Sequence, residues 1–402
     1  MTTPRELGYR MPAEWEPHAA TWLSWPHNER SWPGKLGAIP PVFAKMVAAL
    51  AASETVHINV NDAGMERDAK QHLKQAGARG EIHFHHFPTN DAWCRDHGAI
   101  FVVRDRDLAE EGAENENDSS PLPPGEGPGV KAREQAAHPA PPLHPPCGHL
   151  LPQGGEGIEE RPTNAAKQLA ATNWRYNAWG EKYPHDLDNE IPRQMAAELG
   201  VPVFDVDMVL EGGSIDVNGA GLLMTTESCL LNKNRNPALS RDQIEQTLAA
   251  HLGVDEFLWL GDGIEGDDTD GHIDDLARFV AEETVVTAIE PNRDDVNHGP
   301  LRENLAALKR FHTRAGRPLN VVELPMPPAV VWEGQRLPAT YANFYIANHV
   351  VLLPGYNKRI DEIARGILQE QFRTREVVVI DCTEMIWGFG AFHCLTQQVP
   401  AV

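Results

Sequence analysis

The stretch DTDGHIDDLARFV, residues 268–280, contains the pattern on which most of this chain is built: a short polar cluster followed by an apolar segment. The apolar, β-branched segment continues to residue 289, a helical period follows over 301–314, and a further strand pattern covers 319–323. Helices show apolar residues three and four positions apart, whereas strands show β-branched runs. The stretch therefore predicts a strand–helix–strand unit that begins with polar side chains.

The same unit is predicted four more times along the chain. The third, fourth and fifth helices begin at 241, 301 and 358, a spacing of about sixty residues that indicates a structural repeat. An ordinary α/β sheet would also alternate strands and helices, but five copies favour radial repetition around one central pocket. In the first copy the predicted strand, helix and strand are 19–25, 41–52 and 55–60, and an extra helix follows at 62–75. The same three elements are 99–103, 190–199 and 201–206 in the second copy, 222–231, 241–252 and 256–260 in the third, and 343–353, 358–372 and 376–380 in the fifth.

Composition excludes several classes of function. The 402 residues carry 58 acidic and 35 basic side chains, a formal charge of -23, which argues against nucleic-acid or anionic-membrane binding and suits a small cationic substrate. No apolar run approaches the roughly 18 residues of a membrane span, and the N-terminus lacks a signal-peptide pattern. The five cysteines are scattered without a CxxC pair. Reduced thiols and a cytoplasmic location are therefore expected.

One segment differs in composition from the rest. Residues 106–163 are rich in Pro, Gly, Glu, Asn and Ser and show no sustained period. Such a sequence buries too little apolar surface to offset the entropy of ordering, which predicts a flexible insertion within a single catalytic domain spanning 1–402. Deletion of 112–159 is expected to leave activity largely intact. A metal site inside the insertion is an open alternative, with candidate ligands His138, His144, Cys147 and His149.

Four polar clusters occupy the same position relative to the repeat. DAWCRDHG (91–98), LEGGS (210–214) and DTDGHIDD (268–275) precede copies two, three and four. GFGAFHCLTQQ (388–398) follows copy five and would adjoin copy one if the ring closes. Equivalent points of a radial repeat face one another near its axis. These clusters are therefore predicted to form one active site.

Their side chains suit chemistry on a guanidinium group, which is planar, delocalised and permanently protonated. Asp96 and Asp274 can hold it through charge-assisted hydrogen bonds. Its carbon is a poor electrophile, so a cysteine thiolate, Cys394, is a better nucleophile than water. His272 can protonate the leaving nitrogen and then activate water. Glu211 is predicted to orient His272.

Other arrangements of these residues remain open. His393 adjoins Cys394, but neighbours on an extended chain point to opposite faces, so His272 is the preferred acid and base. A metal-dependent hydrolase could instead use His272, Asp274, His393 and Cys394, and would lose activity to chelators. A non-catalytic guanidine-binding or scaffold protein would bind its ligand without releasing ammonia. Cys94 is interpreted as a structural, buried thiol.

The motifs together resemble the agmatine deiminase and bacterial peptidylarginine deiminase family of guanidine-modifying (pentein) enzymes. The resemblance covers nearly the whole chain except the insertion. The stretches that carry it are MPAEWEPHAATWLSWPHN (11–28), DAWCRDHGAIFV (91–102), WRYNAWGEKYP (174–184), LEGGSID (210–216), DTDGHIDDLARFV (268–280), YANFYIANHVVLLPGYN (341–357) and HCLTQQ (393–398).

This resemblance implies a five-fold pseudo-symmetric α/β propeller and metal-free, cofactor-free hydrolysis through a thiouronium intermediate on Cys394. It assigns Trp93 to a wall of the substrate pocket and gives the other site residues the roles stated above. Agmatine would yield N-carbamoylputrescine and ammonia, a step of putrescine and polyamine synthesis. Two motifs depart from the family pattern, WPHNERSWPG at 25–34 and GFGAFHC at 388–394. They leave peptidyl or free arginine as alternative substrates, and a homo-oligomer is compatible with the family.

Overall fold

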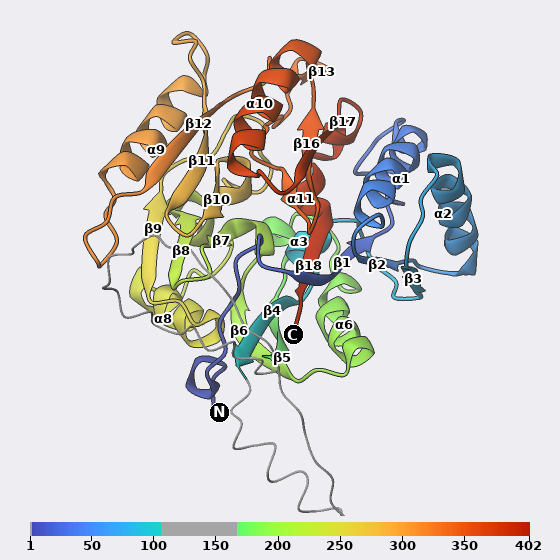
Figure 1. Cartoon of the computed structure of the whole chain (residues 1–402), viewed down its shortest axis with the longest axis horizontal. Coiled ribbons are helices and arrows are strands. Elements are labelled where there is room, and N and C mark those ends of the chain that lie inside the picture. Colours follow the sequence, from blue (N-terminus) through green and yellow to red (C-terminus); the bar gives the residue numbers. More distant parts are fainter. Residues whose placement is uncertain (1, 106–166) are drawn as a thin grey trace, which may run out of the picture. The chain divides into compact units, whose positions relative to one another are not determined.

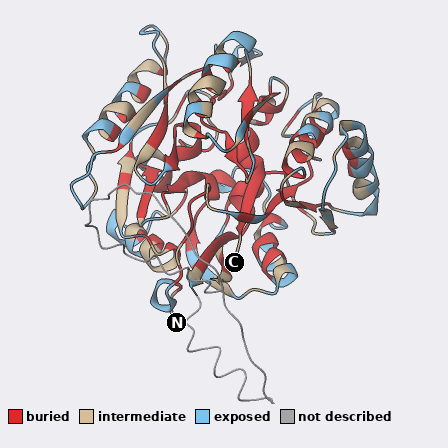
Figure 2. Ribbon diagram, viewed as in Figure 1, coloured by how far each residue is buried: buried red, intermediate tan, exposed pale blue. Residues whose placement is uncertain are grey.

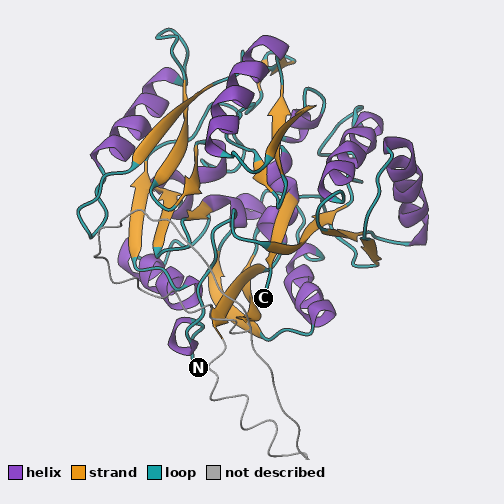
Figure 3. Cartoon of the chain, viewed as in Figure 1, coloured by secondary structure: helices purple, strands orange, loops and turns teal. Residues whose placement is uncertain are grey.

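The computed structural model describes residues 2–105 and 167–402 (Figure 1). The predicted insertion at 106–163, together with its candidate metal ligands, lies outside the described residues. Within the described ranges, no helix has the length and apolar character needed to cross a membrane. Helices lie mainly on the outside of the described part and strands on the inside (Figure 3).

Five sheets share one pattern: a first strand runs antiparallel to a second, which runs parallel to a third. In one of them β4 (Ile100–Asp105) pairs with β5 (Lys167–Arg175), and α6 (Ile191–Leu199) leads to β6 (Val203–Val209). The next sheet has β7 (Ile215–Val217) and β8 (Leu222–Thr226), and α8 (Arg241–Leu252) leads to β9 (Glu256–Leu260). The sheet after it has β10 (Ala277–Ala281) and β11 (Thr284–Ile289), and α9 (His298–Arg310) leads to β12 (Asn320–Pro325). In a fourth sheet β15 (Tyr345–Ile346) and β16 (Val350–Gly355) are followed by α10 (Lys358–Gln371) and β17 (Glu376–Asp381).

The remaining sheet of this pattern joins the two ends of the chain. Strand β18 (Thr396–Pro400) runs antiparallel to β1 (His18–Ser24), and β1 runs parallel to β2 (Thr55–Asn59). The predicted neighbourhood of the last polar cluster and the first copy is confirmed by this pairing. Three further elements belong to this region: α1 (Ile39–Leu50), α2 (Ala63–Ala76) and β3 (Ile82–His85), which pairs with β2.

The predicted unit was wrong in one respect: it had one strand before the helix, whereas the structure has two. The segment 277–289, predicted as a single strand, is the β10–β11 hairpin, which turns at Glu282 and Glu283. The segment 222–231 leaves the sheet at Thr226, whose side chain accepts a hydrogen bond from the Cys229 N–H and caps the helical turn α7 (Glu227–Leu230). The β-branched runs at 277–289 and 222–231 therefore predicted continuous strands where the structure has a turn and a helix cap.

Helix starts follow local capping chemistry. Ser240 and Gln243 form a reciprocal capping box at the start of α8, and Asn357 accepts backbone hydrogen bonds at the start of α10. Both predicted starts are confirmed. The inner faces of the helices pack on the sheets; Phe43 and Val47 of α1, for example, are fully buried in one cluster with Val56 and Ile58 of β2. Burial accordingly concentrates in the strands, and exposure on the outer helix faces (Figure 2).

A short helical turn precedes the first strand of four of these sheets. The turns are α3 (Cys94–His97) before β4, η4 (Gly212–Ser214) before β7, η5 (Ile273–Asp275) before β10, and α11 (Phe392–Leu395) before β18. They correspond to the four polar clusters of the sequence. The fold thus repeats the same local geometry wherever a cluster occurs.

Candidate active site

The four turns meet, which confirms the predicted convergence of the polar clusters. The Gly213 N–H donates to Asp96 Oδ1 at 2.9 Å. The Asp96 Oδ1 atom lies 3.8 Å from His272 Nδ1. Sγ of Cys394 lies 3.6 Å from Asp274 Oδ2. Arg95 Nε donates to the backbone oxygen of His393 at 3.3 Å, so residues 298 positions apart along the chain are direct neighbours.

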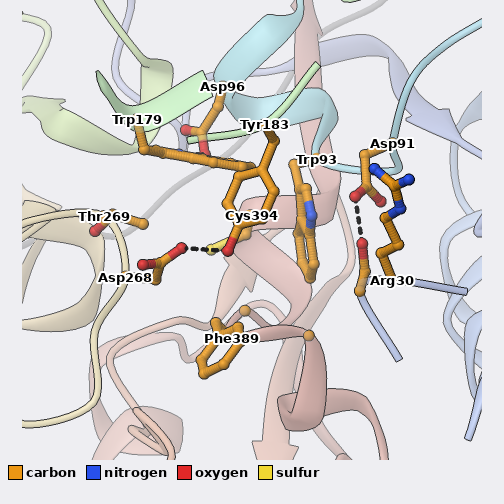
Figure 4. Close-up of a pocket in the computed structure, with 13 residues that line it drawn as sticks. Arg30, Asp91, Trp93, Asp96, Trp179, Tyr183, Asp268, Thr269, Phe389 and Cys394 are labelled. Carbon is orange, nitrogen blue, oxygen red and sulfur yellow. Dashed lines mark hydrogen bonds between the residues drawn. The ribbon is translucent and has the colours of Figure 1, made fainter. Parts of the chain in front are cut away.

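A pocket opens onto this meeting point (Figure 4). Trp93, Asp96 and Cys394 line it as predicted. Glu211, His272 and Asp274 are fully buried and lie behind the lining residues. The other residues of the lining are Arg30, Ser31, Asp91, Trp179, Tyr183, Asp268, Thr269, Gly388, Phe389 and Gly390.

Two glycines permit this close approach. A Cβ atom on Gly213 would lie 2.7 Å from His272 Nδ1 and 2.9 Å from Asp96 Oδ1, so any side chain there would displace the imidazole or the carboxylate. A Cβ atom on Gly390 would lie 2.6 Å from the Trp93 ring and 3.1 Å from Cys394 Cβ. Gly213 and Gly390 therefore let the reactive side chains and the pocket wall come together.

Cys394 lies in an environment that favours its neutral form. Burial, together with the negative charges of Asp274, Asp275 and Asp96, holds the pKa of the Cys394 thiol well above its usual value. A cation placed beside the sulfur would counter these charges and favour the thiolate. The thiol environment is therefore sensitive to a positively charged ligand.

The pKa of the Asp96 carboxyl is set by two opposing kinds of effect. Burial and the charges of Asp274 and Glu211 raise the pKa of Asp96 well above its usual value. Two donors oppose this effect: Gly213 N–H on one oxygen, and the indole Nε1–H of Trp179 on the other at 3.0 Å. These two hydrogen bonds also fix the orientation of the carboxylate.

Asp274 is ionised more readily than its burial would suggest. Burial raises its pKa, but the hydrogen bond and charge of His393 lower it, with smaller contributions from His272 and Arg278, and the net shift is downward. His393 Nδ1 lies 2.6 Å from Asp274 Oδ2, and His393 Nε2 lies 2.9 Å from Glu14 Oε2. Asp274 is thus held as a carboxylate beside the thiol.

The prediction that His393 points away from the site was wrong. It assumed an extended chain, whereas His393 and Cys394 lie in the helical turn α11. Both ring nitrogens of His393 are engaged by carboxylates, so this imidazole supports Asp274. The four-residue metal set considered as an alternative, with His272, Asp274, His393 and Cys394, is not among the groups of described residues whose ligand atoms all lie within 4.8 Å of one another.

His272 is fully buried, and burial lowers its pKa to about 3, although the charge of Asp274 acts in the opposite direction. Neither ring nitrogen has a hydrogen-bond partner among the described residues. Glu211, predicted to orient His272, lies close to it without forming a hydrogen bond. Glu211 Oε1 instead accepts from Arg235 Nε at 2.7 Å, while its Oε2 has no partner within the described ranges.

Sequence reasoning missed Asn343, which lies just ahead of β15. Its side-chain nitrogen lies 3.0 Å from Cys394 Sγ and 3.1 Å from Asp275 Oδ1. The repeat could have indicated Asn343, because this polar residue stands in the fifth copy where the other copies have their polar clusters. Asn343 was overlooked because the first strand that it precedes, β15, has two residues and leaves no periodic signal.

The segment that contains Trp179 and Tyr183 was also missed as part of the site. Tyr183 Oη donates to Asp268 Oδ2 at 2.8 Å across the pocket (Figure 4). Lys182 Nζ lies 3.5 Å from Asp268 Oδ1 and 3.3 Å from Asp270 Oδ1. The sequence marked this stretch as a family motif but gave no indication that it lines the pocket.

Two side-chain groups could hold a metal ion by proximity, each with its ligand atoms within 4.8 Å of one another. They are Glu211, Cys229 and His272, and Asp274, Asp275 and Cys394. Both groups share residues with the candidate active site. Cys94 lies outside them; it is fully buried, and burial raises its pKa to about 12, which fits the predicted structural role.

Comparisons with known proteins identify relatives over almost the full length. A family model described as Porphyromonas-type peptidyl-arginine deiminase matches residues 10–119 and 153–400. A Legionella pneumophila protein that carries the provisional name agmatine deiminase is 31% identical over 403 residues, covering 99% of this chain and 97% of the relative.

Solved structures give the same grouping. The agmatine deiminase of Enterococcus faecalis is 26% identical, with a TM-score of 0.80, and the match covers 100% of this chain and 98% of that one. A cysteine-to-serine variant of the C. jejuni agmatine deiminase, solved with substrate bound, is 27% identical, with a TM-score of 0.74 and coverage of 97% and 96%. The described fold is therefore the mixed α/β fold of these deiminases.

Proposed function

The chain belongs to the family of Porphyromonas-type peptidyl-arginine deiminases, and on this premise we propose that it hydrolyses a guanidinium group, with agmatine as substrate. Water and agmatine would give N-carbamoylputrescine and ammonia, a step towards putrescine. The proposed nucleophile is Cys394, and the proposed intermediate is a covalent thiouronium adduct. Cys394 and its acidic neighbours fit this chemistry.

One observation carries the proposal: buried polar atoms of the candidate active site are left without hydrogen-bond partners among the described residues. Asp274 Oδ1, Glu211 Oε2 and both ring nitrogens of His272 have no hydrogen-bond partner within residues 2–105 and 167–402. A buried acceptor left unpaired costs about 1–3 kcal/mol. A guanidinium offers five N–H donors in one plane and a positive charge for the carboxylates. A flat cation is therefore the ligand that best matches this set.

The binding of such a cation would also activate the nucleophile. A unit charge about 4 Å from the sulfur contributes about 4 kcal/mol at an effective dielectric constant of about 20. That energy corresponds to a fall of about three units in the pKa of the Cys394 thiol. Because burial and the surrounding carboxylates hold this pKa high, the thiolate would form mainly when substrate is bound.

The proposed reaction then has two halves. His272, neutral before the reaction, takes the thiol proton, and the Cys394 thiolate attacks the guanidinium carbon to form the C–S bond. The C–N bond breaks and ammonia leaves with the proton from His272. In the second half, His272 takes a proton from water, and the resulting hydroxide adds to the same carbon. The C–S bond breaks, the proton of the added oxygen passes to the sulfur, and the ureido product leaves. His272 then releases its proton to solvent and is neutral again.

A second substrate class, free or peptidyl arginine, is favoured by one specific observation. Arg30 lines the pocket on the side of Trp93 (Figure 4). The opposite carboxylate, Asp268, is occupied by Tyr183 and Lys182. A cation at the mouth would attract a carboxylate at the far end of the substrate and repel the ammonium of agmatine.

The experiment is a measurement of ammonia release from agmatine, arginine and a peptidyl arginine by the native chain and by Cys394→Ala. We expect activity on a guanidine to fall by at least about 10³-fold in Cys394→Ala, because a covalent step loses its nucleophile. Native activity should be abolished by iodoacetamide and unaffected by EDTA. Undiminished turnover of Cys394→Ala, or loss to EDTA, would overturn the thiol mechanism.

The substrate class is decided by the same panel with Arg30→Ala. If Arg30 discriminates between substrates, this variant should raise the ratio of agmatine to arginine activity by about tenfold, the effect of about 1.4 kcal/mol of charge interaction. Agmatine preferred by both proteins with an unchanged ratio would exclude the arginine alternative.

The finer features of the fold belong to the same proposal. The repeated strand order supports a five-fold pseudo-symmetric propeller that forms one catalytic domain. The scattered cysteines support a cytoplasmic location. Assembly into a homo-oligomer stays a prediction, for which size-exclusion chromatography with light scattering is the measurement.

A further inference from the structure

We propose that Asn343 is a catalytic residue that stabilises the thiolate of Cys394 by donating a hydrogen bond from its side-chain amide to the sulfur. This inference rests on the proposed function, in which Cys394 is the nucleophile. It adds a residue from the fifth repeat unit to the four clusters that the sequence marked.

The amide orientation of Asn343 is fixed by its surroundings. Its Oδ1 faces two backbone donors, the His393 N–H at 3.1 Å and the Cys394 N–H at 3.3 Å. An NH₂ group in that position would meet donors on both sides. Nδ2 must therefore point the other way, towards Cys394 Sγ at 3.0 Å and Asp275 Oδ1 at 3.1 Å. The two amide hydrogens are thus divided between the sulfur and one carboxylate.

The sulfur needs a donor once it is ionised. A neutral thiol can donate its proton to Asp274 Oδ2, 3.6 Å away, but a thiolate cannot. The same Asp274 then repels it, together with Asp275 and Asp96. Among the hydrogen bonds of the described residues, Asn343 provides the one donor that reaches this sulfur.

A neutral donor is chemically suitable at this position. A lysine or arginine would stabilise the thiolate more strongly, but its charge would occupy Asp274 and Asp96 and compete with a cationic substrate. An amide donates without competing for those carboxylates. Asn343 is 1% exposed, so its hydrogen bond to sulfur acts in a medium where such bonds are strong.

Two variants separate the donor role from a merely structural one. Asn343→Asp keeps an oxygen that can accept from the backbone of His393 and Cys394 but replaces the donor with a second oxygen. Asn343→Ala removes the donor without adding charge. Asn304→Asp is the matched control, because Asn304 is 2% exposed, accepts from Gly261 N–H and donates to Asp262 O, and does not line the pocket.

The test is the pH dependence of Cys394 alkylation by iodoacetamide, followed by mass spectrometry of the peptide that contains Cys394. A hydrogen bond to a charged group is worth about one to two pH units of thiol pKa. We expect the midpoint to rise by that amount in Asn343→Ala and by more in Asn343→Asp. Alkylation at neutral pH should be about 10- to 100-fold slower, with the midpoint of Asn304→Asp unchanged.

Turnover provides a second readout. We expect kcat for the preferred guanidine to fall about 10- to 100-fold in both Asn343 variants, with KM nearly constant, because the donor acts on the sulfur. A native alkylation midpoint in Asn343→Ala, or native kcat in Asn343→Asp, would overturn the proposal. Either result would mean that Asn343 has a structural role only. Failure of the proposed function would look different: the native chain would release no ammonia, whatever the thiol pKa.

Discussion

Asp275 lies in the same turn as Asp274, and a carboxylate oxygen of each lies within 4.8 Å of the Cys394 sulfur. Asp275 accepts one side-chain hydrogen bond, from Asn343. Burial and the charges of Asp274 and Asp267 hold the pKa of Asp275 well above its usual value. In the folded protein this group therefore retains a proton that it loses in the unfolded chain at the same pH.

This difference makes a prediction about stability. Where the native state binds more protons than the unfolded state, the free energy of unfolding falls as pH rises towards the native pKa. Asp275→Asn removes the titrating group and keeps an oxygen that can accept from Asn343. We expect the native chain to lose more stability than Asp275→Asn when the pH is raised from 6 to 8 in urea unfolding. Equal losses in the two proteins would contradict the assignment.

At the scale of elements, one turn has an unusual conformation. Ala178, Trp179, Gly180 and Glu181 of α5 (Ala178–Glu181) have φ angles of 48°, 58°, 100° and 64°, a left-handed helical turn. Such a conformation costs about 1–2 kcal/mol for each residue with a side chain. Strain of this kind is concentrated at functional sites. The turn directs the Trp179 indole N–H to Asp96.

Neighbouring elements hold this turn in place. Asn177 caps it by accepting from the Gly180 N–H at 3.0 Å. A Cβ atom on Gly180 would lie 2.4 Å from Asn234 Nδ2, so only glycine fits between the two elements. Tyr183 then bonds Asp268 on the far side of the pocket. The strained turn is therefore fixed at both of its ends.

The prediction for this element concerns Trp179. Trp179→Phe keeps an aromatic ring but removes the donor to Asp96, which raises the pKa of Asp96 further and weakens its hold on a cation. We expect KM for the preferred guanidine to rise about tenfold or more, as for the loss of a charge-assisted hydrogen bond, with a small change in the midpoint of thermal unfolding. Trp174→Phe is the control, because the Trp174 indole donates to Thr172 and does not line the pocket. Equal kinetic effects of the two variants would refute the role of Trp179.

At the scale of the whole molecule, the pairing of β4 with β5 indicates whether the fold needs the residues inserted between them. Asp105 and Lys167 are antiparallel partners, although 61 residues separate them in the sequence. Two antiparallel neighbours can be joined by a turn of two residues. The chain between them is therefore not needed to bring the two strands together.

Deletion tests this reasoning. We expect a protein lacking 112–159 to unfold at nearly the native temperature and to release ammonia at a rate within about twofold of native, since loop length has a small effect on closure entropy. The contrasting variant lacks 396–400, the strand that pairs with β1, and should fail to fold. Loss of folding after removal of 112–159 would show that the insertion contributes to the fold.

The sequence by itself determined those features that depend on near neighbours. The boundaries of α8 agree with prediction because apolar period, capping box and terminal glycine all lie within a few residues. The meeting of Asp96, Asp274 and Cys394 was predictable because a repeat brings equivalent points together. The prediction of a cationic substrate rests partly on the net charge, which also needs no coordinates.

The tertiary structure alone decided the contacts between distant segments. The bonds of His393 to Glu14 and of Arg235 to Glu211 join residues that share no local pattern. Strands as short as β15 and β7 are too brief for a period of two to register, so the first strand of these two units and the role of Asn343 could not be predicted. Hydrogen bonds and charges act through space over a few ångströms, whereas sequence patterns report separation along the chain.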